Sequence, residues 1–548
     1  MARPIECLTV RRSVLLLIGL SSVTFLLGIG RPAISDSDEG FYAEAAREMV
    51  AEGDWLTPRF NYEDRWQKPV LYYWLTAAMF VATGPSESAA RWWSALSGVA
   101  LVLLTWAAAR RLTVNNDAAW LAGAITATCY GYFAMARLAL PDLPLTFLIT
   151  LVIWSALERR WLIAGIAGGL GILMKGPVGI VIPGLVLVPI WWRERGTMKI
   201  RPWDIVTTAG IAVLIALPWY GAMTAEHGIA YLQNFFIGEN LERFATDRFN
   251  APRTIWFYVP ILIGGMLPWS MYLMTLPWPS VVSVIRRQRH LTKTEWRLLL
   301  WAFMPLLFFT MSIGKQPRYI LAILPPLAIL LARSIAARIA RATAGPQIGL
   351  AIATWATSAL YAILAILLYR AKPILIGTYP TLTATGITFF VASAGALVWV
   401  SVSRRWHRLP AVATGCAAAL LLSIQFGALS GKRPEPVEQI AGLIAEHRDA
   451  EQPVGTYQIF VRNLPFYTRV KQHNLHSEEL ARAYLQSAEQ VLLVVRARDL
   501  PHLENFSGIT TRTLGEVPYF NAANARLRTL ISPVPAQELE TALLVTNR

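Results

Sequence analysis

The fold of this chain is decided by residues 142–192, which read DLPLTFLITLVIWSALERRWLIAGIAGGLGILMKGPVGIVIPGLVLVPIWW. Three apolar runs follow one another here, at 142–158, 161–175 and 177–192. Runs of this kind predict membrane-spanning helices, for which about 20 mostly apolar residues are needed. Arg159 and Arg160 fill one turn, whereas Asp142 and Lys175 stand at the opposite corners. The segment therefore predicts three consecutive spans. The turn between the first two carries two arginines, whereas the corners on the other side of the membrane carry Asp142 and Lys175.

The same pattern recurs along most of the chain. Hydrophobic residues make up 55% of its 548 residues and charged residues only 15%, against about 25% in an average soluble domain. We predict an all-α polytopic membrane protein with about 13 transmembrane helices. The predicted spans are 12–30, 91–110, 117–139, 142–158, 161–175, 177–192, 203–222, 255–276, 296–313, 319–333, 347–369, 381–402 and 410–429. The three cysteines, Cys7, Cys129 and Cys416, are too few for a disulfide-stapled secreted scaffold.

Basic residues give a net charge of +16, and their positions indicate membrane topology rather than nucleic-acid binding. They cluster in short turns between the apolar runs, at Arg11–Arg12, Arg110–Arg111, Arg159–Arg160, Arg193–Arg195, Arg286–Arg289, Arg333–Arg341 and Arg404–Arg408. Under the positive-inside rule these turns are cytoplasmic. No basic stripe with interleaved aromatic residues occurs on a soluble segment, which argues against a nucleic-acid partner.

One further apolar segment, Lys68–Gly84, is too short for a straightforward span. If it crossed the membrane, the basic turns could not all be cytoplasmic. We therefore predict a helix in the outer membrane interface, anchored by the aromatic residues Tyr72–Trp74. The N-terminus is then cytoplasmic, the C-terminus lies outside, and the loops 31–90 and 223–254 face the outside.

The chain is predicted to divide into a transmembrane domain, 1–430, and a small α/β domain, 431–548, on the periplasmic side. Strands are expected at Val454–Phe460, Gln490–Val495 and Leu527–Ile531, and helices at Pro436–His447 and Ser477–Ser487. No nucleotide-binding glycine motif occurs in the α/β domain. An enzyme working on the outer face has no nucleotide sugar available, so its donor would be carried on a lipid.

Acidic residues mark the predicted outer corners. Asp38 and Glu39 follow the first span, and Asp142 stands between two apolar runs, where an ionised group is costly unless it is paired or hydrated. A carboxylate at the membrane surface can take a proton from an attacking hydroxyl. The alternative for each residue is an ordinary helix cap.

Cations also gather on the predicted outer side, against the general charge bias. Lys68, Lys175, Lys315 and Arg318 stand in separate corners. A single lysine of this kind usually reaches up to lipid headgroups. Four of them facing acids are better explained by a phosphate site. The nearby stretch Phe235–Phe244 is either a flap over a lipid-linked substrate or a surface helix with solvated charges.

In combination these residues resemble the GT-C membrane glycosyltransferases, in particular the bacterial branch around the protein O-mannosyltransferases and the lipid A aminoarabinose transferases. The resembling motifs occur in order over the first two-thirds of the chain: Asp38-Glu39 with Phe41-Tyr42-Ala43, Gly53-Asp54-Trp55, Gln67-Lys68-Pro69 with Tyr73-Trp74, Leu140-Pro141-Asp142, Lys175-Gly176-Pro177, Glu239-Asn240-Leu241-Glu242-Arg243-Phe244, Leu267-Pro268-Trp269 and Lys315-Gln316-Pro317-Arg318-Tyr319 running into Leu324-Pro325-Pro326.

The resemblance implies an inverting transfer of a sugar from polyprenyl phosphate to a periplasmic acceptor at the inner membrane. It implies catalytic roles for Asp38, Glu39 and Asp142. Residues implied near the donor phosphate are Lys68, Lys315, Arg318, Tyr319 and Arg243. Residues implied to line the substrate cavity are Tyr42, Gln67, Tyr73, Lys175, Glu239 and Asn240.

The chain departs from this family at two positions. Gln67 and Asn240 stand where aminoarabinose transferases carry Glu and His, the positions expected to hold a metal. No metal ligand is therefore assigned, a divalent cation is disfavoured, and a neutral sugar is favoured. The acceptor could be lipid A, protein or another glycan. Two alternatives stay open, a ligase or oligosaccharyl transferase moving a preassembled glycan, and a transporter of a lipid-linked substrate.

Overall fold

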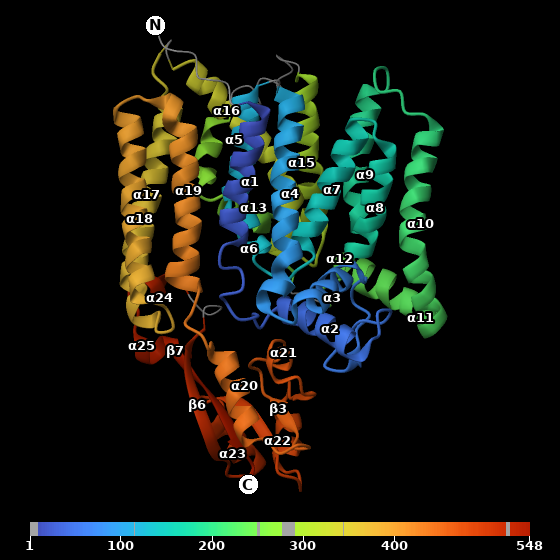
Figure 1. The fold of residues 1–548 in the computed structure, drawn as a ribbon, viewed down its shortest axis with the longest axis vertical. Coiled ribbons are helices and arrows are strands. Elements are labelled where there is room, and N and C mark those ends of the chain that lie inside the picture. The colour runs from blue at the N-terminus through green and yellow to red at the C-terminus, as the bar shows by residue number, and fades with distance from the viewer. Residues whose placement is uncertain (1–8, 114, 249–251, 277–290, 343–344, 522–525) are drawn as a thin grey trace.

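A computed structural model describes residues 9–113, 115–248, 252–276, 291–342, 345–521 and 526–548. Long helices lie side by side and form a bundle, and the C-terminal residues form a separate lobe at one end of it (Figure 1). Three predicted features fall outside the described residues: Cys7, the basic turn at Arg286–Arg289, and residues 249–251 of the second outer loop.

The bundle contains helices of very different lengths. They are α1 (Val10–Leu26), α4 (Glu87–Thr113), α5 (Asn116–Thr128), α6 (Tyr130–Ala136), α7 (Asp142–Leu157), α8 (Trp161–Lys175), α9 (Val178–Glu194), α10 (Pro202–His227), α13 (Tyr258–Gly265), α15 (Lys293–Met311), α16 (Leu324–Ala340), α17 (Ile348–Ala371), α18 (Pro380–Val402) and α19 (Leu409–Ile424). Short 3-10 and π segments extend or join them: η2 (Ile255–Phe257), η3 (Trp269–Thr275), η4 (Pro317–Ile323), η5 (Lys372–Ile374), η6 (Trp406–Arg408) and η7 (Gln425–Leu429).

Among the described residues, six helical segments are long and apolar enough to cross a membrane, and a bent pair makes up to seven. The protein is therefore a multi-pass membrane protein. Each predicted span overlaps a helical segment, although several of these segments, such as α7 and α8, are short. The number 13 stays a prediction.

Two predicted spans are not continuous helices. The prediction for 255–276 was wrong in this respect, because the chain bends by 108° between its two helical halves, after Gly265. The predicted span 117–139 is interrupted at Cys129, where the backbone is extended and separates α5 from α6. Composition shows that a segment is apolar, but it does not show where packing against neighbouring helices bends or interrupts that segment.

The turns between α4 and α5, α7 and α8, and α9 and α10 lie at the end of the bundle away from the C-terminal lobe (Figure 1). These are turns that carry clustered arginines. The other end carries α2 (Asp38–Glu52), α3 (Leu71–Thr83), α11 (Ile229–Leu232), η1 (Gln233–Glu242), α12 (Arg243–Ala245) and a small hairpin of β1 (Arg59–Phe60) and β2 (Glu63–Asp64). The basic turns and the C-terminal lobe thus occupy opposite ends, as predicted.

The C-terminal lobe is an α/β domain. Its sheet has the order β4-β3-β5-β7-β6, in which β3 pairs in parallel with β4 and β5, and β7 pairs antiparallel with β5 and β6. The strands are β3 (Val454–Thr456), β4 (Gln472–Asn474), β5 (Leu492–Arg496), β6 (Arg512–Phe520) and β7 (Leu539–Thr546). The helices are α20 (Pro436–His447), α21 (Leu464–Thr468), α22 (Glu478–Leu485), α23 (Leu500–Ser507), α24 (Leu527–Ile531) and α25 (Pro535–Glu538).

Sequence patterns located part of this domain. The predicted helix Pro436–His447 is α20, and the predicted strand at 490–495 overlaps β5. The predicted strand Leu527–Ile531 was wrong, because these residues form the one-turn helix α24. A five-residue stretch has too little periodicity to distinguish the two. Three strands were missed, β4 at one edge of the sheet and the antiparallel pair β6 and β7 at the other.

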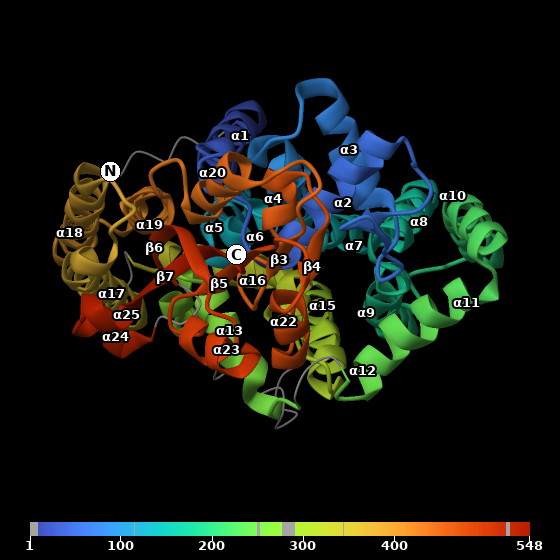
Figure 2. The same ribbon diagram turned by 90° about the horizontal axis from the view of Figure 1, so that it is seen from below.

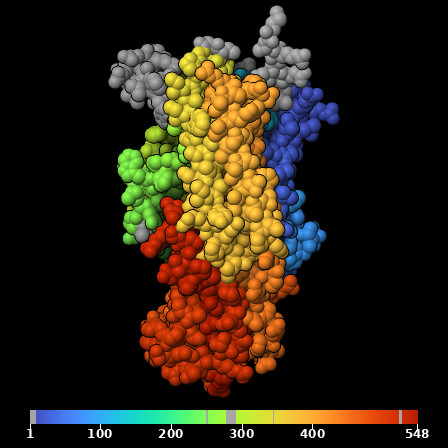
Figure 3. Space-filling model, turned by 90° about the vertical axis from the view of Figure 1, so that its left-hand side faces the viewer, coloured from blue at the N-terminus to red at the C-terminus, as the bar shows by residue number. Residues whose placement is uncertain are grey.

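The two lobes meet where the first outer loop leaves the bundle. Viewed from below, the sheet and α20 lie over α2, α4 and the middle of the bundle (Figure 2). From the side, the C-terminal domain forms a lobe beneath α17 and α18 (Figure 3). Hydrogen bonds tie the lobes together, since the Asn463 amide donates to the Ile34 carbonyl at 2.8 Å and the Ile34 N–H donates to the Tyr467 hydroxyl at 2.7 Å.

Candidate active site

A cavity of about 1050 Å³ opens at the end of the bundle that faces the C-terminal domain. Its polar lining comes from α2, the loop before α3, the helix ends at Asp142 and Lys175, η1, α12, the start of η4, and one residue of the C-terminal domain. The rest of the lining is apolar, with Leu145, Ile149, Val178, Val181, Phe236, Leu241, Phe244, Phe308, Phe309 and Ala322. The cavity therefore has a charged end and an apolar wall.

Local sequence places the two aspartates at helix starts. Asp38 is the first residue of α2, whose N-cap Ser37 accepts a hydrogen bond from the Glu39 N–H at 3.3 Å. Asp142 is the first residue of α7, after Pro141. Lys175 ends α8, and Gly176 follows in a left-handed conformation with φ 84°. Acids at helix starts and a base at a helix end match the helix dipoles.

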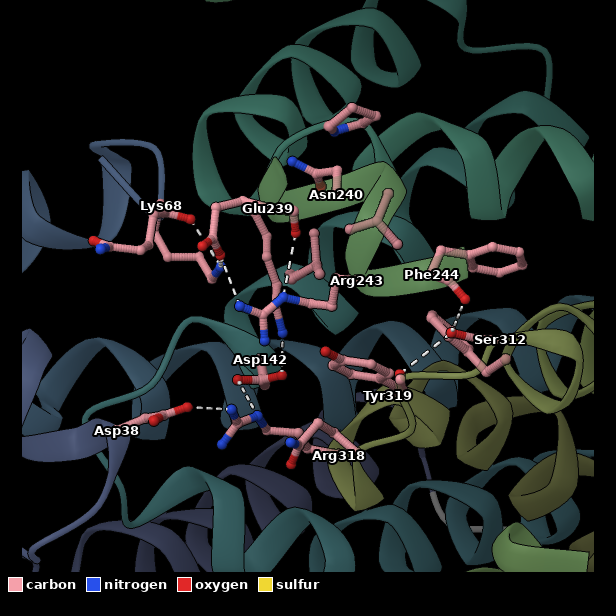
Figure 4. Close-up of a pocket in the computed structure, with 18 of the residues that line it drawn as sticks. Asp38, Lys68, Asp142, Glu239, Asn240, Arg243, Phe244, Ser312, Arg318 and Tyr319 are labelled. Carbon is pink, nitrogen blue, oxygen red and sulfur yellow. Dashed lines mark hydrogen bonds and ion pairs between the residues drawn. The ribbon is translucent and has the colours of Figure 1, made fainter. Parts of the chain in front are cut away.

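Arg318 connects the two aspartates (Figure 4). Its Nη2 donates to Asp38 Oδ2, and its Nε lies 3.5 Å from Asp142 Oδ2. Lys175 Nζ donates to the other oxygen, Asp142 Oδ1, at 2.5 Å, and this ammonium also lies 5.1 Å from the ring centre of Tyr319. Asp142 is almost fully buried, so its charge is compensated by two basic groups rather than by water.

The pKa of Asp38 reflects the same neighbours. Burial alone would raise it, but the charge and hydrogen bond of Arg318, helped by Arg462 and Arg65, lower the pKa below its usual value. Asp38 is therefore an ionised carboxylate at neutral pH. That is the form that a general base requires.

A second ion cluster surrounds Glu239. Its Oε2 accepts from Arg243 Nη2 at 2.7 Å and from Lys68 Nζ at 3.3 Å (Figure 4). Burial, together with the positive charge of Arg243, lowers the pKa of Lys68 to about 7, although Glu239 opposes this shift. Lys68 is thus poised to gain or lose a proton near neutral pH.

Eleven of the predicted site residues line the cavity: Asp38, Tyr42, Gln67, Lys68, Asp142, Lys175, Glu239, Asn240, Arg243, Arg318 and Tyr319. Two further basic residues, Arg65 and Arg462, were missed by sequence reasoning. Arg65 belongs to none of the motifs quoted above. Arg462 belongs to the C-terminal domain, more than 140 positions after Arg318.

Three predicted residues lie behind the cavity instead of lining it. Glu39 is completely buried, and its carboxylate accepts from Arg91 Nε at 2.7 Å and from the Ala139 N–H at 2.9 Å. Lys315 Nζ donates to backbone carbonyls, that of Ser312 at 2.5 Å. Tyr73 stacks on Tyr42, with ring centres 5.2 Å apart. These contacts are those of supporting residues.

The two positions expected to hold a metal in the resembling enzymes carry amides here, Gln67 and Asn240, which are neutral and weaker metal ligands than a carboxylate or an imidazole. Asn240 Nδ2 donates to the Phe235 carbonyl at 2.7 Å. Among the residues that the structure describes, no three His, Cys, Asp or Glu side chains gather as a group that could hold a metal ion.

This chain is similar in sequence and fold to several known proteins. Residues 34–227 match the family model described as dolichyl-phosphate-mannose-protein mannosyltransferase. The undecaprenyl phosphate-alpha-4-amino-4-deoxy-L-arabinose arabinosyl transferase 2 of Pseudomonas fluorescens strain Pf0-1 is 32% identical over 352 residues, which cover 61% of each chain. The match therefore spans about three-fifths of the length of that relative.

Solved structures share the fold over nearly the whole chain. ArnT from Cupriavidus metallidurans bound to undecaprenyl phosphate has a TM-score of 0.72 at 21% identity, and 98% of both chains is covered. The oligosaccharyltransferase of Archaeoglobus fulgidus has a TM-score of 0.53 at 12% identity, covering 89% of this chain and 69% of the other. In its fold, and in the sequence of residues 34–227, this chain is similar to the arabinosyl transferases and to the protein mannosyltransferases named above.

Proposed function

We propose that this protein is an inverting glycosyltransferase that moves a sugar from undecaprenyl phosphate, or a similar polyprenyl phosphate, to an acceptor on the periplasmic side of the bacterial inner membrane. One observation carries the proposal. The charged end of the cavity has six basic side chains, Arg65, Lys68, Lys175, Arg243, Arg318 and Arg462, around only three acids, Asp38, Asp142 and Glu239, and it adjoins an apolar wall. An excess of positive charge suits a phosphate, and the apolar wall suits the lipid that carries it.

The lipid phosphate fits the cluster of Lys68 and Arg243. Both cations pair with Glu239, and the cavity lining holds more basic than acidic side chains, so net positive charge faces a ligand. Aromatic and aliphatic residues of η1 and α15, such as Phe236, Leu241 and Phe308, line the same cavity and would cover the first isoprene units. As the bond from the sugar to the phosphate breaks, these cations stabilise the charge that builds up on the leaving phosphate.

Asp38 is proposed as the catalytic carboxylate. A hydroxyl of the acceptor attacks the anomeric carbon from the face opposite the phosphate, and Asp38 takes its proton. An acceptor phosphate would arrive already ionised, and Asp38 would then orient it. Arg318 holds Asp38 in position, and Asp142 with Lys175 in turn holds Arg318. Both substrates are thereby kept in one cavity, which adds proximity.

The sugar is proposed to be neutral. All three acids of the charged end are already ion-paired within the protein, Asp38 with Arg318, Asp142 with Lys175, and Glu239 with Arg243. Each of these described carboxylates thus already has a basic partner, which disfavours the ammonium of an amino sugar as a further one. This preference separates the chain from the relative named for 4-amino-4-deoxy-L-arabinose.

The decisive experiment is mass spectrometry of envelope glycolipids and glycoproteins from cells with and without the gene. A single-sugar mass increment that disappears from one fraction identifies sugar and acceptor together. Loss of a complete oligosaccharide would favour a glycan ligase. An unchanged product, combined with accumulation of the lipid-linked donor on the cytoplasmic side, would favour a transporter and contradict the proposal.

A further inference from the structure

The charged end of the cavity contains two separate basic groups. Lys68 and Arg243 pair with Glu239 beside the apolar wall. The second group surrounds Asp38 beneath the C-terminal domain and consists of Arg318, Arg462 and Arg65. If the first group holds the lipid phosphate, the second faces the side from which an acceptor reaches Asp38.

Arg462 is the one residue of the C-terminal domain among the side chains that line this cavity. The loop that carries it is fixed at several points. The Arg462 N–H donates to Asp36 Oδ1 at 2.8 Å, and the neighbouring Asn463 donates to the Ile34 carbonyl. The helix α2 also passes so close that a Cβ at Gly40 would overlap the Arg462 carbonyl. The position of Arg462 is therefore set by the docking of the whole domain.

Two arginines hold Asp38, one at each oxygen. Arg318 bonds Oδ2, whereas Arg462 Nη1 lies 3.5 Å from Oδ1. The side chain of Arg318 is 24% exposed and that of Arg462 is 43% exposed. Arg318 is also held by Asp142, but the guanidinium of Arg462 has no second carboxylate among the ion pairs of the described residues. Arg462 is therefore the partner that Asp38 can exchange for a substrate.

The ring of Phe41 provides a second contact for the Arg462 guanidinium when this group does not pair with Asp38. The guanidinium of Arg462 lies 5.0 Å from the centre of the Phe41 ring, and that of Arg65 lies 4.1 Å from the same centre. A guanidinium within about 6 Å of the centre of an aromatic ring is attracted to the face of that ring. The ring can thus hold Arg462 while Oδ1 is free.

We infer that Arg462 is a positioning residue for the acceptor: in the free protein it occupies Oδ1 of Asp38, and it yields that oxygen to the acceptor while remaining beside it on Phe41. The inference rests on the proposed function and extends it, because it makes the C-terminal α/β domain part of the active site. When the acceptor is a hydroxyl, Oδ1 receives its proton as the acceptor oxygen bonds to the anomeric carbon. The electron pair of the breaking bond leaves with the polyprenyl phosphate.

The test compares Arg462→Gln and Arg462→Lys in the full-length purified protein. Arg498→Gln is the matched control, because Arg498 is an exposed arginine of the same domain that pairs with Glu540, and it does not line the cavity. We expect Arg462→Gln to raise the acceptor KM at least 10-fold, with the donor KM and the Tm unchanged. We also expect the acidic limb of the kcat/KM profile to move to higher pH, because Asp38 loses one charge that lowers its pKa. Arg462→Lys restores part of both effects.

Three results decide the matter. An Arg462→Gln protein with the wild-type acceptor KM and pH profile would overturn the inference. Equal increases in both KM values with a lower Tm would also overturn it, because they indicate only a structural role. Binding of undecaprenyl phosphate to the wild-type protein, measured by thermal shift, tests the proposed function separately. If the wild type neither binds this lipid nor transfers a sugar, the proposed function fails and the inference fails with it.

Discussion

Arg318 lies between Asp38 and Asp142 and bonds the first through Nη2 while its Nε lies 3.5 Å from the second. One guanidinium thus joins residues that are 104 positions apart, 38 and 142, and fixes their distance from each other. A planar guanidinium can bridge two carboxylates in this way, and a lysine ammonium cannot reproduce the geometry.

Arg318→Lys should lower kcat about 10²- to 10³-fold, the range seen when one preorganised electrostatic contact is removed from an active site. The physical reason is that lysine keeps the charge but holds only one aspartate. Steady-state transfer assays with saturating donor measure the effect. Full activity of Arg318→Lys would show that the bridge is not needed.

Asp38→Asn should lower kcat about 10²- to 10⁴-fold, because the amide cannot take a proton. Binding of undecaprenyl phosphate should stay within about twofold of the wild type, since the Lys68 and Arg243 cluster is untouched. Asp117→Asn is the control, because Asp117 lies in the first turn of α5 and does not line the cavity. Wild-type transfer by Asp38→Asn would remove this residue from the catalytic role.

Affinity for a polyprenyl phosphate donor should decline as the pH rises through about 7. Burial and the charge of Arg243 lower the pKa of Lys68 to about 7, so the lysine is protonated below this pH and becomes neutral above it. The donor phosphate is a diester whose charge does not change in this range. Kd measurements between pH 6 and 9 show the decline.

Lys68→Arg is the control for this pH dependence. An arginine stays charged throughout the range, so the affinity of the variant should be independent of pH. If Lys68→Arg and the wild type show the same decline, another group is responsible. The comparison does not depend on absolute affinity.

Glu39→Gln should destabilise the protein rather than abolish its chemistry. Glu39 and Arg91 form a completely buried ion pair, and removal of one partner of such a pair costs about 3–5 kcal/mol. We expect a lower Tm and a lower yield, with the kcat of the folded fraction within about threefold of the wild type. A large loss of kcat at unchanged Tm would return Glu39 to the catalytic group.

Gly40→Ala should loosen the C-terminal domain. The added methyl group overlaps the Arg462 carbonyl, and the overlap is with backbone that cannot rotate away. Strain of this size typically costs about 1–3 kcal/mol. We expect faster proteolysis between the two lobes and an increased acceptor KM. Gly19→Ala is the control, because the space around the Cβ position of Gly19 is open. Gly53→Ala is unsuitable, because Gly53 has a φ of 71°, which an alanine adopts only with strain.

The sequence alone predicted the class of the protein and named most of the predicted site residues that line the cavity. Apolar runs and basic turns predict a polytopic membrane protein with its polar corners at one end. The reason is that the free energy of moving a residue from water into the membrane depends mainly on the side chain of that residue. The predicted lining residues that are charged could be named because charged groups beside apolar runs are costly unless they serve a site. The uncharged ones, Tyr42, Gln67, Asn240 and Tyr319, could be named only through the resemblance to the membrane glycosyltransferases.

Only the tertiary structure decided which charges meet. Glu39 stands next to Asp38 in the chain, but the helical turn of α2 directs it toward Arg91 and into the core. Arg462 is 424 positions from Asp38 and nevertheless lies against it, because the α/β domain docks on the first outer loop. Ion pairing depends on distances of a few ångströms. These distances are set by the packing of segments that lie far apart in the chain, so they cannot be read from the order of the residues.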